Sequence, residues 1–585
     1  RPSLLLDFAN SKTLDPRITF TRGSTATYWD GHTTTKAEEN LLSYSQELER
    51  TSNWSRFETT VTANATTAPD GTTTAEALIE TTSNNYHNLA ESIDYSGSAS
   101  FYIKANGRTK GNFRFLSGTP NSSNSILFDL SAVTVNVQSS GTSATITDVG
   151  NSWYRIGITG ISNANRFIVE IRDNSNQSVY AGDGSSGFYI WGFQAESRDT
   201  VTAYTPTTSS PIVKYQPTLQ TAASGEARFD HDPVTGESKG LLIEEARTNT
   251  FTYSGRPTFS YIGQGSAYVE QGIAPDGTNR ATLCVPNTVN TSHVFDVYGQ
   301  TNTTSANTFS YFVKPYGYYH CQLYFSATGY ASSVNFDLST GTVGTASSGV
   351  TGHIEEIGNG WWRIAMTFSP TGITSDIQRF RILGPSGEDN FAGDGFSGML
   401  VWGKQHENGS FPTSYIETTS AAVTRSVDLC EVGDVSSWYS ADRGTMYAEY
   451  TQFGNGSLGT SGIWEIYDLS SGTTGWDLRN TTTESILYGQ QSNGNQTVIL
   501  SGAAYGGYNV EHRAIVSWST SSIRVATEYD ATSVTSSANS TFAAYEMEIG
   551  RHDRNSGRVL NGHFKKVSYT PAEYGETTVR AMLEE

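Results

Sequence analysis

The chain contains a duplicated pattern, and this duplication restricts the possible folds more than any other feature of the sequence. Ala68-Pro-Asp-Gly-Thr returns 206 positions later as Ala274-Pro-Asp-Gly-Thr, and Trp191-Gly-Phe-Gln-Ala-Glu returns 211 positions later as Trp402-Gly-Lys-Gln-His-Glu. Further matches lie between these two and keep their order. Because few patterns repeat over hundreds of residues by accident, the duplication predicts two domains of one fold in tandem.

The repeated segments have the composition of β-strands. The chain holds 57 glycines, its aromatic fraction is 12% and its charged fraction is only 16%, which is typical of many short strands joined by turns. In the run Trp361-Trp-Arg-Ile-Ala-Met-Thr-Phe, residues alternate between two faces, and the face with Trp362, Ile364, Met366 and Phe368 is the predicted core side. We therefore predict an all-β protein whose two repeats are β-sandwiches of the jelly-roll type.

The order of these signals divides the chain into five parts, because 585 residues exceed what one hydrophobic core can hold. The last part has its own strand-like runs and a predicted terminal helix near Glu576–Leu583. The parts are a leader (1–39), repeat 1 (40–210), a connector with a second leader (211–248), repeat 2 (249–428) and a C-terminal β-sandwich (429–585).

Charge and cysteine content exclude several classes of protein. With 37 basic and 57 acidic residues, the net charge of -20 repels phosphate backbones, so we expect no nucleic-acid partner. No apolar run approaches the roughly 18 residues of a membrane span, so membrane insertion is not expected. The three cysteines cannot form a disulfide framework; a Cys284–Cys321 bridge is conceivable, but repeat 1 has no cysteine at the matching places.

Two leader segments carry a resemblance to a known group of proteins. Asp7-Phe-Ala-Asn-Ser-Lys-Thr-Leu-Asp-Pro-Arg-Ile-Thr-Phe-Thr-Arg-Gly-Ser-Thr-Ala-Thr-Tyr and Gly240-Leu-Leu-Ile-Glu-Glu-Ala-Arg-Thr-Asn resemble segments of bacteriophage tail and fibre proteins. The duplicated unit looks like a carbohydrate-binding-module sandwich. The C-terminal part, with Met547-Glu-Ile-Gly-Arg and Gly562-His-Phe-Lys-Lys-Val-Ser-Tyr, looks like a concanavalin A or laminin-G domain.

The resemblance implies a virion structural protein that touches a glycan on the host surface. It also implies other tail proteins as partners and a symmetric homo-oligomer, with a trimer favoured. The sequence does not decide between tail and head attachment.

Aromatic residues outside the repeated strand motifs are the candidate ligand groups, because sugars bind to flat aromatic faces and planar polar groups. The repeated tryptophans are more simply explained as core. Each cluster could equally pack between subunits of a fibre. The candidates are Tyr316, Tyr318 and Tyr319 in repeat 2 and Trp438, Tyr439, Tyr505 and Tyr508 in the C-terminal part.

Asp183 and Asp394 lie in a Gly-Asp-Gly turn that occurs in both repeats. An aspartate in such a turn commonly binds its own backbone, and calcium is the alternative, which would need more oxygen ligands nearby. No cofactor is required by the sequence, and calcium is possible.

No nucleophile elbow, phosphate loop, zinc-protease or dinucleotide motif occurs. Glu546 and Glu548 would share a strand face, as a pair of glycosidase carboxylates could, but this spacing is frequent on exposed strands. His552 and His563 are predicted to be solvated loop residues. We expect a non-catalytic virion appendage that binds glycans; a polysaccharide depolymerase and a purely structural decoration or connector protein are the alternatives.

Overall fold

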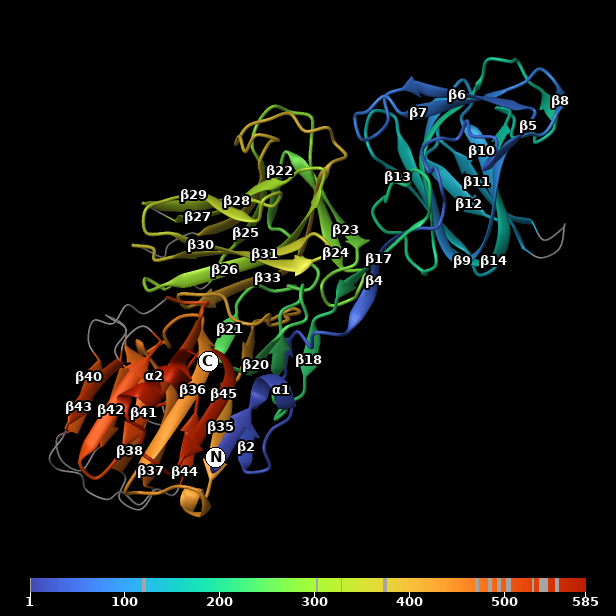
Figure 1. Ribbon diagram of the computed structural model, residues 1–585. Helices are drawn as coiled ribbons and strands as arrows, with labels where there is room; N and C mark the ends of the chain where they lie inside the picture. Colours follow the sequence, from blue (N-terminus) through green and yellow to red (C-terminus); the bar gives the residue numbers. More distant parts are fainter. Residues whose placement is uncertain are drawn as a thin grey trace.

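The computed structural model describes residues 2–117, 123–300, 303–327, 329–371, 376–468, 473–481, 487–491, 496–500, 507–528, 531–535, 546–552 and 557–584. Strands hold 55% of the chain and helices 3%, so the all-β class with several sandwich-like sheets is confirmed. In Figure 1, repeat 1 (blue to cyan) lies to one side, repeat 2 (green to yellow) is central, and the C-terminal domain (orange to red) lies beyond it.

Repeat 1 forms one continuous ten-stranded sheet around a single core. The order is β12-β11-β10-β14-β9-β16-β7-β6, with β13 on β14 and β5 on β9. β8 and β15 form a separate two-stranded sheet. The strands of repeat 1 are β5 (Trp54–Phe57), β6 (Thr59–Thr66), β7 (Ala75–Glu80), β8 (Asn84–Asn85), β9 (His87–Asn106), β10 (Lys110–Ser117), β11 (Ser123–Asp129), β12 (Thr134–Val137), β13 (Ser143–Asp148), β14 (Tyr154–Arg172), β15 (Tyr180–Ala181) and β16 (Gly187–Glu196).

The long strands β9 and β14 run through both halves of this sheet. Their register shifts three times between Ile158 and Arg166, and such bulges bend paired strands. At Gly97 in β9, with φ +145°, a Cβ atom would lie 2.0 Å from the Glu196 carbonyl oxygen, so a glycine is needed where the chain bends.

Repeat 2 has the same strand neighbours but two separate six-stranded sheets, β22-β25-β32-β27-β28-β29 and β23-β24-β33-β26-β31-β30. Its strands are β22 (Tyr261–Gly263), β23 (Gly265–Gly272), β24 (Ala281–Pro286), β25 (His293–Tyr298), β26 (Asn307–Tyr316), β27 (His320–Ala327), β28 (Tyr330–Asp337), β29 (Thr342–Ala346), β30 (Thr351–Gly358), β31 (Trp361–Phe368), β32 (Ile377–Ile382) and β33 (Gly398–Asn408).

The predicted core face of β31 is confirmed. Ile364, Met366 and Phe368 belong to the core between the two sheets, and Trp362 packs against that core. Trp361 is also buried, at 1% exposure, in a second cluster that includes Trp29 of the leader.

The C-terminal domain contains two larger sheets and a terminal helix, α2 (Glu576–Glu584), where the sequence predicts one. Cys284, Cys321 and Cys430 are free and buried. β34 (Val423–Arg425) ends repeat 2 and pairs with β21 (Arg247–Asn249). The elements of the C-terminal domain are β35 (Leu429–Gly433), η1 (Val435–Ser437), β36 (Gly444–Gln452), β37 (Thr460–Asp468), β38 (Thr473–Thr481), β39 (Leu487–Gln491), β40 (Gln496–Leu500), β41 (Glu511–Trp518), β42 (Ser522–Thr527), β43 (Ala531–Thr535), β44 (Glu546–Ile549) and β45 (Gly562–Thr570).

The leader and connector supply strands to the C-terminal sheets. β1 and β20 both pair with β45, with Leu4 opposite Tyr569 and Leu241 opposite Phe564, and β2 pairs with β35. Their elements are β1 (Leu4–Asp7), α1 (Phe8–Ser11), β2 (Ile18–Thr21), β3 (Ala26–Tyr28), β4 (Thr34–Asn40), β17 (Ile212–Pro217), β18 (Gln220–Ala222), β19 (Phe229–His231), β20 (Ser238–Ile243) and β21 (Arg247–Asn249).

These pairings make the C-terminal sandwich discontinuous in sequence, since Leu4, Leu6, Phe8 and Leu241 lie in its core. The leader and connector therefore complete a domain instead of only linking domains. Among the described residues, no helix is long and apolar enough to span a membrane.

Candidate functional site

A cleft of about 810 Å³ opens where the leader, the connector, repeat 2 and the C-terminal domain meet. We call it the junction cleft. Its walls come from β19 and β20, from β30, and from the ends of β36, β41 and β45. Its lining includes Trp29, Asp230, Lys239, Glu355, Tyr508 and Lys565.

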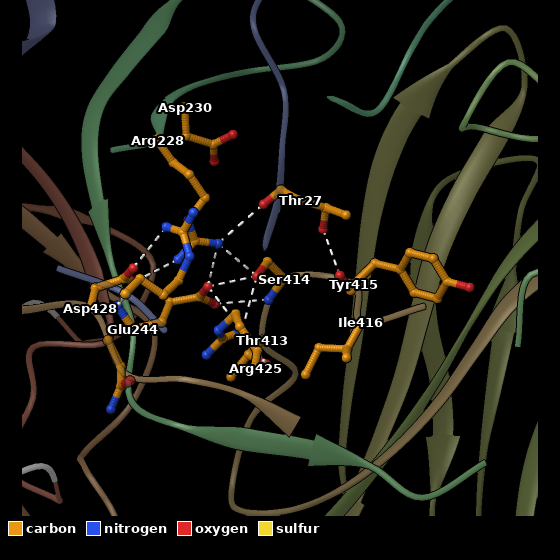
Figure 2. Close-up of polar contacts among 12 residues, drawn as sticks. Thr27, Arg228, Asp230, Glu244, Thr413, Ser414, Tyr415, Ile416, Arg425 and Asp428 are labelled. Carbon is orange, nitrogen blue, oxygen red and sulfur yellow. Dashed lines mark hydrogen bonds and ion pairs between the residues drawn. The ribbon is translucent and has the colours of Figure 1, made fainter. Parts of the chain in front are cut away.

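A buried arginine network lies at the junction and joins the leader, the connector and the end of repeat 2 (Figure 2). It consists of Arg22, Arg228 and Arg425 with the carboxylates of Glu244 and Asp428, all at most 1% exposed. Arg228 lies 2.8 Å from a Glu244 oxygen and 2.5 Å from an Asp428 oxygen. Glu244 also accepts bonds from the Ser414 amide and hydroxyl, at 2.8 and 2.6 Å.

This network keeps its charges although its side chains are buried. Burial alone would raise the pKa of Glu244, but Arg425 and Arg228 outweigh that effect and hold this pKa well below its usual range. Because an unpaired buried charge is very costly, each partner fixes the position of the others. The network thus holds the walls of the junction cleft in place.

One wall of the junction cleft carries a carboxylate–imidazole–hydroxyl chain. His563 Nε2 lies 2.8 Å from an Asp230 oxygen, and His563 Nδ1 lies 3.2 Å from the Thr451 hydroxyl. The Trp29 amide donates to the other Asp230 oxygen at 2.7 Å. His563 is 4% exposed and His552 is 2% exposed, so the prediction of solvated loop positions was wrong: both lie where strands pack side chains from distant segments.

Two lysines of the junction cleft each lie between two carboxylates. Lys239 is 3.5 Å from Glu355 of repeat 2 and 3.7 Å from Asp232. Lys565 is 2.6 Å from Glu511 and 3.6 Å from a further glutamate of the connector. Burial lowers the pKa of Lys239, but Glu355 and its other acidic neighbours raise it above its usual value.

These contacts decide which ligands the junction cleft can accept. Its lysines are already compensated by carboxylates, so they offer hydrogen-bond donors and no uncompensated positive charge. Tyr28, Phe453 and Tyr508 add aromatic surface. The combination suits a neutral, polyhydroxylated ligand.

Of the predicted C-terminal aromatics, only Tyr508 lines the junction cleft, and it is 46% exposed. Tyr505 lies outside the described residues. Trp438 is 6% exposed with its ring 5.3 Å from that of Tyr569, and Tyr439 packs on the same ring at 5.8 Å. Trp438 and Tyr439 therefore serve the core, because the turn of η1 directs both rings inward.

The three tyrosines around Gly317 do not form one cluster. Tyr316 packs on Phe396 at the interface between the repeats, at 5.6 Å, and burial raises its pKa well above the usual value. Tyr318 is 7% exposed, whereas Tyr319 is 48% exposed but lies outside the junction cleft. The positive φ of Gly317, 100°, turns the chain so that these rings diverge.

Asp183 and Asp394 bind their own turns. An Asp183 oxygen accepts from the amides of Ser185 and Ser186, both at 2.7 Å, and Asp394 accepts from the two corresponding amides at 2.8 and 2.7 Å. In the part of the chain that the structure describes, no group of three or more His, Cys, Asp and Glu side chains is placed to hold a metal ion.

A row of carboxylates on the C-terminal domain was missed by the sequence analysis, which considered only pairs within one strand. The strand registers place Glu548 opposite both Glu431 and Glu465, and Glu465 opposite Asp477. Arg551 lies 3.0 Å from Glu548. No local pattern could have revealed the row, because it crosses four strands.

Comparisons with known proteins give little further information. No protein-family model and no curated protein matches the chain. Among solved structures, Trypanosoma rangeli sialidase in complex with the inhibitor DANA is 9% identical, with 91% of this chain and 98% of that chain covered and a TM-score of 0.21. The complex of the same enzyme with sialic acid gives 9% identity, the same coverage and a TM-score of 0.20. Similarities this weak carry no argument.

Proposed function

We propose that the protein is a subunit of a bacteriophage tail fibre, spike or similar virion appendage, and that it binds a host-surface glycan without cleaving it. The observation that carries the proposal is the junction cleft, which combines exposed Tyr508 with charge-compensated lysines and carboxylates. The two leader segments that resemble phage fibre proteins support the virion setting.

In this proposal the two repeats are jelly-roll sandwiches that form a shaft or shoulder. The C-terminal domain is a concanavalin A-like head that presents the junction cleft. Other tail proteins attach the subunit, and a homotrimer multiplies weak single-site contacts. No cofactor is needed, and calcium, if it binds, acts at the Asp183 or Asp394 turn.

A glycan array with the purified full chain tests the proposal. We expect binding to neutral glycans, and about fivefold weaker binding by Tyr508→Ala, because loss of one stacked ring costs on the order of 1 kcal/mol. Tyr319→Ala is the matched control, since Tyr319 is 48% exposed but lies outside the cleft. Absence of binding by the wild-type oligomer would exclude the glycan-binding role.

Polysaccharide depolymerisation is the second candidate, favoured by one observation. Glu465 and Glu548 are direct cross-strand neighbours, and paired carboxylates are what glycoside hydrolysis uses. Their burial, at 3% and 1% exposed, and the Arg551 bond to Glu548 count against this role. Incubation with host polysaccharide should then release new reducing ends, and Glu548→Gln should abolish them. A purely structural connector would neither bind nor cleave.

A further inference from the structure

The outer face of one sheet of repeat 2 carries a row of side chains that the core does not use. Tyr261 on β22 lies opposite Asp296 on β25, and Asp296 lies opposite Arg379 on β32. Arg379 in turn lies opposite Tyr324 on β27. Directly opposed residues point to the same face, whereas their neighbours, such as Phe380, belong to the core.

The tyrosines of this row are accessible. Tyr261 is 51% exposed, and Tyr298, which follows Asp296 by two positions on the same face of β25, is 43% exposed. Tyr324 is half-buried, because the guanidinium groups of Arg379 and Arg381 lie over its ring at 5.4 and 5.6 Å. We call Tyr261, Tyr298, Tyr324, Arg379 and Arg381 the tyrosine platform.

The charges of the tyrosine platform are balanced within the protein. Arg379 binds Asp296 with two nitrogens, at 2.6 and 2.8 Å, and this hydrogen bonding raises the pKa of Arg379 above its usual value. Arg381 lies 3.1 Å from Asp389. The guanidinium groups are thus held rigidly and can donate hydrogen bonds, but they do not present an uncompensated positive charge.

Repeat 1 has the same strand register without these tyrosines. The positions that correspond to Tyr261 and Tyr298 are Ser55 and Ser92, and the position of Tyr324 is occupied by Arg114. Repeat 1 nevertheless forms its core. The exposed rings of repeat 2 are therefore not needed to build the fold.

We propose that the tyrosine platform is a second glycan site, separate from the junction cleft, and that it binds a neutral polysaccharide strand. Aromatic faces cover the C–H side of pyranose rings, and the fixed guanidinium donors bind hydroxyl groups. Charge balance favours a neutral strand over a sulfated or uronate-rich one. The inference extends the proposed glycan-binding function, and the two sites can be tested separately.

Affinity electrophoresis of the full chain tests the proposal, with native gels that contain a β-1,3-glucan, a β-1,4-mannan, a xylan or, for comparison, a sulfated galactan. We expect retardation by at least one neutral polysaccharide. The double variant Tyr261→Ala/Tyr298→Ala should bind it tenfold or more weakly. Phe57→Ala/Tyr86→Ala is the matched control, because it removes two exposed rings of repeat 1, 47% and 43% exposed.

The platform proposal would be overturned if the double variant were retarded as strongly as the wild-type chain, or if the wild-type chain preferred the sulfated galactan. It would also be overturned if the double variant had a different oligomer mass in sedimentation, because the platform would then be an interface between copies. Loss of binding only in Tyr508→Ala would also overturn it but leave the proposed function standing. No retardation of the wild-type chain in any gel would overturn the platform proposal, while the glycan array tests the proposed function independently.

Discussion

The two repeats have separate cores of matching composition and differ in side chains outside the matching positions. His87 and His293 occupy matching positions and are fully buried, and each ring lies between two backbone carbonyls, with each ring nitrogen near one carbonyl oxygen. In contrast, repeat 1 buries the carboxyl group of Glu91 where repeat 2 has Val297. The difference teaches that the duplicated residues maintain the fold, whereas the buried carboxyl of Glu91 and the tyrosines of the proposed glycan sites are not duplicated.

The largest expected effect concerns the shared core. Phe128 and Phe336 are 3% and 1% exposed and occupy matching positions. Replacing either by alanine should cost about 3–5 kcal/mol, because a cavity replaces a packed ring. Hydrogen exchange with mass spectrometry on the full chain reports each repeat separately. If only one of the two variants, Phe128→Ala or Phe336→Ala, lost stability, the two cores would not be equivalent.

The matched histidines give the next test. His87 Nδ1 lies 2.7 Å from the Glu58 carbonyl oxygen and Nε2 lies 3.2 Å from that of Tyr180. His87→Ala and His293→Ala should each destabilise their own repeat by about 2–3 kcal/mol, because a buried carbonyl loses its donor and a cavity replaces the ring. If hydrogen exchange showed that one of the two variants kept its stability, the histidine of that repeat would be dispensable.

The pH dependence should differ between the repeats. Burial raises the pKa of Glu91 from 4.5 to about 7. Between these values folded repeat 1 keeps a proton that the unfolded chain releases, so its stability is full below pH 4.5 and falls by about 2 kcal/mol as pH rises to 7.

Two variants separate this carboxyl from other titrating groups. Glu91→Gln should make the pH-dependent fall in stability of repeat 1 shallower, and the remaining fall comes from Glu76, whose pKa burial raises to about 9. Repeat 2 of the wild-type chain should instead gain stability as the pH rises from about 4 to 6.5, because burial lowers the pKa of His406 to about 4 and the unfolded chain then binds the extra proton. Val297→Glu should transfer the dependence to repeat 2. An unchanged slope in Glu91→Gln would assign the effect to another group.

The smallest effect is expected at the repeated turns. Asp183 accepts from two amides and from the Ser186 hydroxyl at 2.7 Å, so Asp183→Ala should lower the unfolding midpoint slightly and Asp394→Ala by still less. Thermal unfolding with and without calcium measures this. A calcium-dependent rise of the wild-type midpoint that both variants abolish would instead establish these turns as metal sites.

Local patterns were sufficient for the repeats, the strand content, the core face of β31 and the terminal helix. The alternation of Ile364, Met366 and Phe368 predicts burial because successive residues of a strand face opposite sides. The turn role of Asp183 was also predictable, because its partners are two and three residues away. Of the predicted aromatic ligands that the structure describes, only Tyr508 lies in the junction cleft.

The sequence by itself determined that this chain is an all-β protein with a tandem duplication, because those features depend on neighbouring residues and on comparison along the chain. Only the tertiary structure decided that Leu4 pairs with Tyr569, that Asp230 meets His563 and that Tyr261 shares a face with Arg379. Strand pairing joins residues that can be hundreds of positions apart, and a shift of one residue would turn each side chain to the other face. The duplication therefore identifies the scaffold, and the register places the candidate binding surfaces on it.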